Sequence, residues 1–385
     1  MTDFVFRAPP RIISEIDGLE RLGQLAQELG MKRPLLVCDQ GIVACGIAGR
    51  ASKVLAAAGL KAATFDAVLA DPPVQMVRKA VEAARAAETD GVIGLGGGSS
   101  LDTAKVVALL AHSTQTIEEI YGVDMATGGR LPLIQVPTTA GTGSEVTWVS
   151  VITNENGEKK AVYTPQLLPD IALLDARLTV GMPPKVSAAT ALDAMVHAIE
   201  AYTSRTRKNP VADALARKAL ELLARNLPLV LENGQDLQAR SAVLEGAMLG
   251  GMAFVNASVA AIHGLAYPLG ARFHVPHGHS NALVMGPVLR FNLRAATGAY
   301  AELARCVLPG RSFASTAEAA EAFVSRMEEM AGYGGLETRL SQVGVGEADI
   351  PGMAEEVVTQ IQRLIATNPC DMNLEDVTAI YRSIL

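Results

Sequence analysis

The stretch GVIGLGGGSSLDTAK, residues 91–105, decides how the first half of this 385-residue chain folds. Its first five residues form a short apolar run of the kind that makes a buried strand. Gly96, Gly97 and Gly98 follow, and glycines allow positive φ angles and a close approach of the backbone to a ligand. The remainder has helical character. The order of strand, glycine turn and helix is typical of a parallel α/β sheet.

Three further apolar runs resemble the first. They are PLLVC at 34–38, LIQVP at 133–137 and IALLD at 171–175, and an Ala-rich stretch at 74–87 has helical spacing. Short buried strands that alternate with helices predict a doubly wound parallel sheet for this part of the chain.

The pattern changes at GMPP, residues 181–184. Beyond it, strand-like runs are few and helical periodicity dominates, for example in a helix that is expected to end before Pro228 and in residues 237–252. We therefore predict two domains, an α/β domain at 1–180 and an all-helical domain at 181–385.

Composition and charge exclude several classes of protein. Lys plus Arg number 33 and Asp plus Glu number 40, which gives a net charge of −7. Such a chain has no global field that attracts phosphates, so we expect neither nucleic acid nor a membrane as partner. The N-terminus lacks the pattern of a signal peptide, and no apolar run reaches the roughly 20 residues that span a bilayer. The four cysteines form no CxxC pair, which favours a cytoplasmic location.

The glycine loop is a candidate phosphate site. Ser99 or Ser100 is expected to cap the following helix, with Asp102 in its first turn. The exposed N–H groups and the helix dipole then favour a pyrophosphate. The loop matches neither GxGxxG nor the Walker pattern. A tight turn that needs glycine and binds nothing is the alternative.

Two other segments follow strands and carry groups suited to a dinucleotide. Asp39 follows the run at 34–38, where a carboxylate accepts hydrogen bonds from ribose hydroxyls and repels a 2′-phosphate, which favours NAD over NADP. PTTAGTGSE at 137–145 offers hydroxyl and N–H groups to phosphate, ribose or nicotinamide. Taken alone, both segments are equally consistent with ordered turns.

Histidines gather in the second half of the chain, where five of the six fall between residues 197 and 279. Asp193 and His197 are four residues apart in a strongly helical segment, so they share one face of a helix. His263 and His277 follow, 14 residues apart. Three imidazoles and one carboxylate suit a divalent transition metal, Fe²⁺ or Zn²⁺.

Four long motifs together point to a family. GGGSSLDTAK at 96–105, PTTAGTGSE at 137–145, GMPPKVSAATALDAMVHAIEAYTS at 181–204 and the histidine-bearing segment at 263–283 resemble the iron-containing, group III alcohol dehydrogenases. The resemblance extends from Phe4 to the C-terminal NLEDVTAIY. It implies an N-terminal dinucleotide-binding α/β domain, an all-α C-terminal domain with a cleft between them, and an architecture shared with dehydroquinate synthase.

The resemblance also implies roles for individual residues. It implies metal ligation by the set reached from spacing, Asp193, His197, His263 and His277. The candidates for cofactor contacts, from the loops and the resemblance together, are Asp39, Gly96, Gly97, Gly98, Ser99, Asp102, Thr138, Thr139, Thr142, Lys160 and Leu178. Members of the family are commonly dimers or larger assemblies, so we expect a homo-oligomer.

One position departs from the family pattern. The segment after the third ligand usually reads HxxxH, and here Tyr267 replaces the second histidine. A phenol titrates at about pH 10 and an imidazole at about 6.5, so Tyr267 is a poorer proton shuttle at neutral pH. Either protons leave through water and ribose hydroxyls, or His274 substitutes, or the substrate differs. Tyr267 and His274 are the catalytic candidates, and Arg272 is a hypothetical contact for an anionic substrate or else a surface residue.

The expected activity is hydride transfer between NAD(H) and a small primary alcohol or aldehyde, whose oxygen is activated on Fe²⁺. One alternative is an NAD- and metal-dependent lyase of the sugar-phosphate cyclase type, which needs a cluster of basic residues to hold a phosphate. Another is a reductase of a carboxylated semialdehyde or keto acid. The sequence leaves the physiological substrate, the direction of the reaction and the native metal open.

Overall fold

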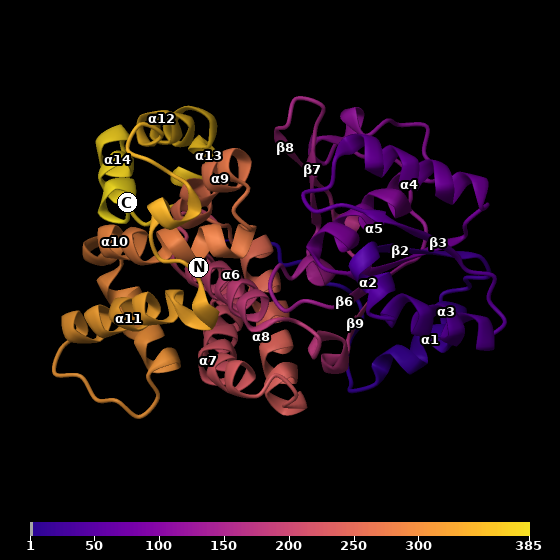
Figure 1. Ribbon diagram of the computed structural model, residues 1–385, viewed down its shortest axis with the longest axis horizontal. Coiled ribbons are helices and arrows are strands. Elements are labelled where there is room, and N and C mark those ends of the chain that lie inside the picture. The colour runs from indigo at the N-terminus through magenta and orange to yellow at the C-terminus, as the bar shows by residue number, and fades with distance from the viewer. Residues whose placement is uncertain (1–2) are drawn as a thin grey trace. The chain divides into compact units, whose positions relative to one another are not determined.

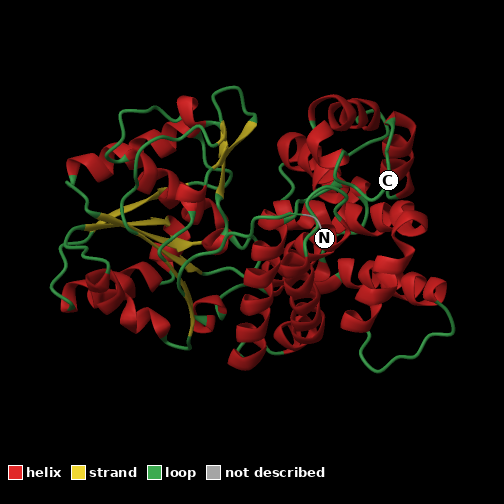
Figure 2. Ribbon diagram, turned by 180° about the vertical axis from the view of Figure 1, so that it is seen from behind, coloured by secondary structure: helices red, strands yellow, loops and turns green. Residues whose placement is uncertain are grey.

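The computed structural model describes residues 3–385 and divides the chain into two compact units. One unit comprises residues 7–181, and the other comprises residues 182–385 together with residues 3–6. Figure 2 shows that the strands belong to the first unit, whereas the second unit is built from helices and loops. We call them the α/β unit and the helical unit.

A six-stranded parallel sheet forms the centre of the α/β unit, with the strand order β1-β9-β6-β4-β2-β3. The four apolar runs found in the sequence form β2, β4, β6 and β9, and the predicted doubly wound parallel sheet is confirmed. The strands are β1 (Ile12–Ser14), β2 (Pro34–Asp39), β3 (Ala63–Val68), β4 (Gly91–Gly96), β6 (Leu133–Pro137) and β9 (Ile171–Leu174).

Helices cover both faces of this sheet (Figure 1). Successive side chains of a strand point to opposite faces, so β2 contributes Leu35 and Val37 to one apolar core and Leu36 and Cys38 to the other. The first core lies under α4 and α5, and the second under α1 and α3. The helices are α1 (Leu22–Glu28), α2 (Gln40–Ala44), α3 (Ile47–Ala57), α4 (Val74–Ala86) and α5 (Gly98–Leu110).

The α/β unit also carries a small sheet that the sequence analysis did not predict. Strands β7 (Val149–Thr153) and β8 (Lys159–Tyr163) pair antiparallel, and β5 (Gly122–Val123) pairs with β8. The turn between β7 and β8 is closed by the Asn154 N–H, which donates to the Glu158 carbonyl over 2.8 Å. Short 3-10 turns complete the unit at Gly18–Arg21, Glu118–Ile120, Ser144–Val146, Pro165–Leu167 and Ala176–Thr179.

Helix α6 (Pro184–Thr203) is the central helix of the helical unit. Nearly every side chain from Ser187 to Tyr202 is buried, because α6 packs against α7, α8 and α10. Its many alanines allow neighbouring backbones to approach closely. The other helices are α7 (Pro210–Glu232), α8 (Leu237–Asn256), α9 (Ala261–Phe273), α10 (His277–Val307), α11 (Thr316–Ala331), α12 (Ile350–Gln360), α13 (Gln362–Ile365) and α14 (Leu374–Ser383), with 3-10 turns at Tyr333–Gly335 and Leu340–Val343.

The structure corrects one helix boundary. Helix α7 does not end before Pro228 but continues through it to Glu232. A proline inside a helix removes one backbone hydrogen bond. The buried face of α7, which extends from Ala212 to Val230 on a helix that packs against α6 and α8, outweighs that loss.

In the described residues no single helix is long and apolar enough to cross a membrane. Helices α8 and α9 reach the required length and composition only as a pair, and they are bent by 105° at their junction. Much of the apolar surface of both helices is buried inside the helical unit.

Candidate functional site

The carboxyl ends of β2 and β4 lie at a topological switch point of the sheet. The chain leaves β2 to form β3 on one side and later returns to form β4 on the other. In open α/β sheets such a point leaves a crevice in which ligands bind. Asp39 is the last residue of β2 and Gly96 is the last residue of β4, so two candidate cofactor residues stand at this edge.

The glycine loop leads into α5 without a side-chain cap. Gly96 has a φ of 147°, a value that favours glycine, and Gly97 is the N-cap residue. The prediction that Ser99 or Ser100 caps the helix is wrong, because both lie inside its first turn. Within residues 3–385, no acceptor takes up the N–H groups of Gly98, Ser99 and Ser100. These groups and the helix dipole suit an anion such as a phosphate.

The second loop lies against the first. The Thr138 N–H donates to the Gly96 carbonyl over 3.0 Å. A Cβ atom on Gly98 would lie 2.8 Å from Thr142 Cγ2, and one on the preceding residue would lie 3.5 Å from Thr139. All three threonines singled out in the sequence therefore border the glycine loop.

Asp39 lies beside the same loop. Its Oδ1 accepts a hydrogen bond of 3.1 Å from the Ile42 N–H and so caps α2, while the Ser100 hydroxyl lies 3.4 Å from its Oδ2. The turn and the dinucleotide interpretations are therefore compatible, since the cap uses one oxygen and the other faces the glycine loop. We call Asp39, residues 96–99 and residues 138–142 the loop cluster.

Asp102 lies near the loop cluster, and its carboxylate accepts hydrogen bonds from other groups of the protein. It is not in the first turn of α5 as predicted. Its Oδ1 accepts from the Ser144 hydroxyl at 2.6 Å and from Lys105 Nζ at 3.3 Å, and its Oδ2 accepts from the Val151 N–H at 2.8 Å. The fully buried Lys105 also donates to Ser144, to Thr147 and to the Val149 carbonyl over 2.8–2.9 Å. The pair fastens α5 to the segment that follows the second loop.

Two further cofactor candidates lie elsewhere in the α/β unit. Lys160 is on β8 and pairs with Glu158 over 3.0 Å, while Leu178 is buried in the apolar core under α1 and α3. Within residues 3–385, no hydrogen bond or ion pair joins either side chain to the loop cluster.

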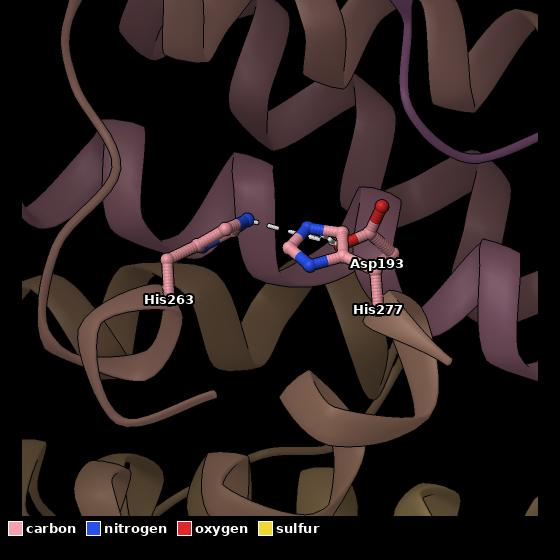
Figure 3. Close-up of side chains that lie close together, drawn as sticks. All are labelled: Asp193, His263 and His277. Carbon is pink, nitrogen blue, oxygen red and sulfur yellow. Dashed lines mark ion pairs between the residues drawn. The ribbon is translucent and has the colours of Figure 1, made fainter. Parts of the chain in front are cut away.

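Three of the four metal-ligand candidates, Asp193, His263 and His277, place their ligand atoms within 4.8 Å of one another in the helical unit (Figure 3). Asp193 Oδ1 lies 3.5 Å from His277 Nε2 and 3.8 Å from His263 Nε2. His197 Nε2 lies 4.0 Å from the same oxygen, and its ring stacks on that of His263 with centroids 4.8 Å apart. Donor atoms at these separations can share one divalent ion, whose bonds to oxygen and nitrogen are about 2.0–2.2 Å.

Three helices supply these side chains. Asp193 and His197 lie one turn apart on α6, His263 is in the first turn of α9, and His277 begins α10. The residue after His277 is Gly278, where a Cβ atom would lie only 2.3 Å from the Ala189 carbonyl oxygen. The missing side chain therefore lets α10 approach the backbone of α6 closely enough for His277 to reach Asp193.

Burial and charge favour a cation between these groups. Asp193 is only 2% exposed. Burial raises the pKa of its carboxyl group, but the imidazoles of His197, His277 and His263 outweigh this effect and keep the pKa below its usual value. A buried carboxylate is stable only when it is paired or ligates a metal.

Comparison with known proteins shows the family of this chain. The family description "Iron-containing alcohol dehydrogenase" matches residues 9–176, and "Fe-containing alcohol dehydrogenase family, C-terminal" matches residues 187–385. The chain belongs to the iron-containing alcohol dehydrogenase family. The predicted family, fold class and alcohol or aldehyde oxidoreductase activity are confirmed, and the lyase alternative is not favoured.

Several relatives of this dehydrogenase cover nearly its whole length. It is 37% identical to the long-chain-alcohol dehydrogenase 1 of Geobacillus thermodenitrificans over 95% of this chain and 92% of that one. It is 32% identical to the NAD-dependent methanol dehydrogenase of Bacillus methanolicus, and both chains are covered completely. A crystal structure of 1,3-propanediol oxidoreductase superposes over the full length of both chains with a TM-score of 0.96 and 33% identity.

Two residues that the sequence analysis did not single out contact the ligand candidates of the dehydrogenase. The Asn281 amide donates to Asp193 Oδ1 over 2.6 Å, and its Nδ2 lies 3.3 Å and 3.4 Å from the Nε2 atoms of His263 and His277. Glu200 accepts from His263 Nδ1 at 2.6 Å. Its spacing of seven from Asp193 on α6 was the available signal for Glu200, whereas nothing in the spacing marks Asn281.

The two catalytic candidates of the dehydrogenase differ in their surroundings. Tyr267 is one turn after His263 on α9, and its ring centroid lies 6.2 Å from that of His277. His274 is exposed at the end of the same helix, with a φ of 55°. Of these two candidates, Tyr267 has a ring contact with a ligand candidate, and within residues 3–385 His274 has none.

Arg272 is engaged in an ion pair. Its Nε and Nη2 donate to Glu356 over 2.9 Å and 2.7 Å, and Nη2 also donates to the Gly352 carbonyl at 3.1 Å. The hypothesis that this guanidinium serves an anionic substrate is therefore not supported, because the charge is already paired with a carboxylate of α12. His279, outside the ligand set, contacts the Glu337 carbonyl through Nε2 at 2.9 Å.

Proposed function

We propose that this dehydrogenase binds one divalent metal ion through Asp193, His197, His263 and His277, and NAD(H) through the loop cluster, to interconvert a small primary alcohol and its aldehyde. Fe²⁺ is the proposed native ion, and Zn²⁺ fits the same donors. The observation that carries the proposal is the convergence of three imidazole Nε2 atoms on Asp193 Oδ1 within 3.5–4.0 Å.

The residues fit such an ion. The donor set is one carboxylate and three imidazoles, the composition that suits divalent iron or zinc. The site also contains an orphaned buried atom, since Asn281 Oδ1 has no hydrogen-bond partner within residues 3–385. Neutral imidazoles and an ionised carboxylate are the forms that ligate a divalent metal.

The bound groups supply Lewis-acid polarisation of the substrate oxygen and hydride exchange at the nicotinamide. The chain's own contribution begins with binding. The N–H groups of Gly98, Ser99 and Ser100 have no acceptor within residues 3–385 and suit the pyrophosphate of the cofactor. Asp39 accepts from the ribose hydroxyls through the oxygen that does not cap α2, which favours NAD over NADP.

The chain also handles a proton. We propose that Tyr267, which lies next to His277, orders the path by which the hydroxyl proton of the alcohol leaves. A phenol ordinarily titrates at about pH 10, so it can donate and accept hydrogen bonds without ionising at neutral pH. Water and the ribose hydroxyls then carry the proton onward. His274 remains the second candidate for this role.

The substrate class follows from the chemistry of the site and its relatives. Uncharged alcohols and aldehydes are favoured over carboxylated semialdehydes, because Arg272 is paired with Glu356. The names of the relatives refer to long-chain alcohols, 1,3-propanediol and methanol, which supports small or apolar alcohols in general. We further propose a cytoplasmic homo-oligomer, supported by four free cysteines and by the family resemblance, and light scattering tests the oligomeric state.

The test is metal-dependent turnover. Protein stripped with a chelator and reloaded with Fe²⁺ without oxygen is mixed with NADH and a panel of aldehydes, and nicotinamide absorbance is followed. We expect turnover that the chelator abolishes and Fe²⁺ restores. His197→Ala should lower the rate by roughly 100-fold or more, since a Lewis acid contributes several kcal/mol and each 1.36 kcal/mol is tenfold.

A matched control uses a histidine outside the site. His112 is exposed in the α/β unit, and His112→Ala should leave both the metal content and the rate unchanged. Undiminished turnover in the chelated protein, or in His197→Ala, would contradict the proposed metal site.

A further inference from the structure

Glu200 is a buried carboxylate behind the metal-ligand candidates. It lies on α6, seven residues after Asp193, and is only 3% exposed. An isolated charge at this depth is unstable, so the partners of the Glu200 carboxylate must stabilise it. Those partners are not on α6, the helix that carries Glu200, but at the start of α9.

Glu200 accepts three hydrogen bonds from a single turn of chain. Its Oε2 accepts from the Ala260 N–H at 2.8 Å and contacts His263 Nδ1 at 2.6 Å, and its Oε1 accepts from the Ile262 N–H at 2.6 Å. The first N–H groups of a helix have no partner within the helix, and a negative charge is favourable there. The carboxylate thus fastens the N-terminus of α9 to α6.

The contact with His263 also fixes the proton on the ring. An ionised carboxylate only accepts hydrogen bonds, so the proton of the neutral imidazole must be on Nδ1. A neutral imidazole has one N–H, and Nε2 is then left with a lone pair. That Nε2 atom is the one that lies 3.8 Å from Asp193 Oδ1.

His279, two residues after the ligand candidate His277, is held through its other ring nitrogen. Its Nε2 contacts the Glu337 carbonyl oxygen at 2.9 Å, so this nitrogen is taken by the protein. Of these two buried histidines, His263 is held through Nδ1, so its Nε2 faces the other ligand candidates. His279 is held through Nε2 instead.

We propose that Glu200 is a positioning residue for the metal: it holds His263 in the tautomer that leaves Nε2 free to ligate and sets the place of α9 relative to α6. This rests on the proposed metal site. Because α6 also carries Asp193 and His197, this helix supplies two of the proposed ligands directly and positions another, His263, through Glu200. A histidine ligand oriented by a carboxylate typically binds its metal 10–100-fold more tightly than one without it.

The first test replaces the carboxylate with an amide of the same shape. In Glu200→Gln the charge is lost and an NH2 group replaces one of the two accepting oxygens, so the contacts with the Ala260 N–H, the Ile262 N–H and His263 Nδ1 can no longer all be kept. We expect Co²⁺ or Fe²⁺, titrated against a competing chelator, to bind roughly 10–100-fold more weakly. Binding within twofold of the wild type by a folded variant would overturn the proposal.

Three variants separate positioning from other effects. Glu200→Asp keeps the charge, but its side chain is too short for all three contacts, so this variant should also bind metal more weakly. Wild-type metal affinity in Glu200→Asp would show that charge alone matters. Glu337→Gln alters a carboxylate-bearing partner of His279, and Glu356→Gln loosens α9 at its other end through Arg272. Both should keep wild-type metal affinity, and an equal loss in Glu356→Gln would mean that loosening α9 suffices.

A spectroscopic measurement needs no variant to fold. In metal-free wild-type protein with ¹⁵N-labelled histidine, two-bond ¹H–¹⁵N correlations at alkaline pH should show His263 protonated on Nδ1. Protonation on Nε2 would overturn the role of Glu200. If the tautomer is as expected but no metal binds to the wild type, the proposed function fails instead.

Discussion

The two units of this dehydrogenase build their sites from different materials. The loop cluster of the α/β unit is made largely of main-chain groups at the ends of neighbouring strands, with Asp39 and a few hydroxyls beside them. The proposed metal site of the helical unit is made of side chains from three helices whose positions in the sequence span Asp193 to His277. Sheet topology determines the first site, whereas close helix packing determines the second. Each site should therefore fail separately.

The largest expected effect comes from Lys105→Met in the α/β unit. Removing this fully buried cation leaves Asp102 without its charged partner, and breaking a buried pair costs about 3–5 kcal/mol. The tether between α5 and the segment after the second loop is lost with it. We expect a lower unfolding temperature and weaker NADH binding by fluorescence, with Co²⁺ affinity unchanged.

Lys218→Met provides the control, because Lys218 is exposed and pairs with Glu221 on the surface of α7. Its effect on unfolding should stay below about 1 kcal/mol. A parallel loss of Co²⁺ affinity in Lys105→Met would contradict the independence of the two sites.

Glu145, which ends the second loop, should make stability depend on pH. Burial raises the pKa of its carboxyl group to about 7 from 4.5, although Lys105 lowers it in part. Between these values the folded state holds a proton that the unfolded chain has lost. The free energy of unfolding therefore falls as pH rises through this window, by about 3 kcal/mol in total at 1.36 kcal/mol per unit of pKa.

Glu145→Gln removes this titration and is measured by urea unfolding at pH 4.5 and pH 8. The variant should resemble the wild type at the lower pH and be more stable than it at the higher pH. Equal stability differences at both values would show that Glu145 is ionised throughout.

The packing of the helical unit is tested by Gly278→Ala. The added Cβ would meet the backbone of Ala189 at 2.3 Å, so α10 must move away from α6. Overpacking of this kind costs about 1–3 kcal/mol, and His277 is displaced from Asp193. Co²⁺ affinity should fall at least tenfold while NADH affinity stays the same.

The matched control lies on the same helix. A Cβ on Gly298 meets nothing within 4 Å, so Gly298→Ala should stabilise α10 by about 0.5–1 kcal/mol through backbone entropy. Wild-type metal affinity in Gly278→Ala would refute the importance of close packing.

The smallest effect is expected for Arg272→Ala. The ion pair with Glu356 is partly exposed, and such pairs contribute about 0–1 kcal/mol. Michaelis constants for neutral and carboxylated aldehydes should change by the same factor. A selective rise for the carboxylated substrate would restore the semialdehyde hypothesis.

The sequence was sufficient where local pattern governs the structure. The strands at 34–38, 91–95 and 133–137 are short, largely apolar runs, and the turn after each could be located with them. The spacing of Asp193 and His197 gave a shared helix face because α6 is regular there.

Sequence reasoning failed where tertiary contacts decide. The first turn of α5 lacks a side-chain cap, and Pro228 lies inside a helix because packing outweighs one lost hydrogen bond. The contact of Asp102 with a buried lysine 3 residues away was not foreseen, since the acceptors around Lys105 come from the 144–149 segment. The contacts of Asn281 depend on how α10 lies on α6, which no local spacing specifies.

Helix α6 carries Asp193, His197 and Glu200 at intervals of four and three residues. A single residue inserted between the first and the last of these would rotate everything beyond it by about 100° and swing one group to the far side of the helix. An insertion or deletion anywhere in this span would therefore misplace at least one of the three groups. Evolution can therefore lengthen or shorten this chain in its loops, whereas the span from 193 to 200 is fixed in length for as long as the site is kept.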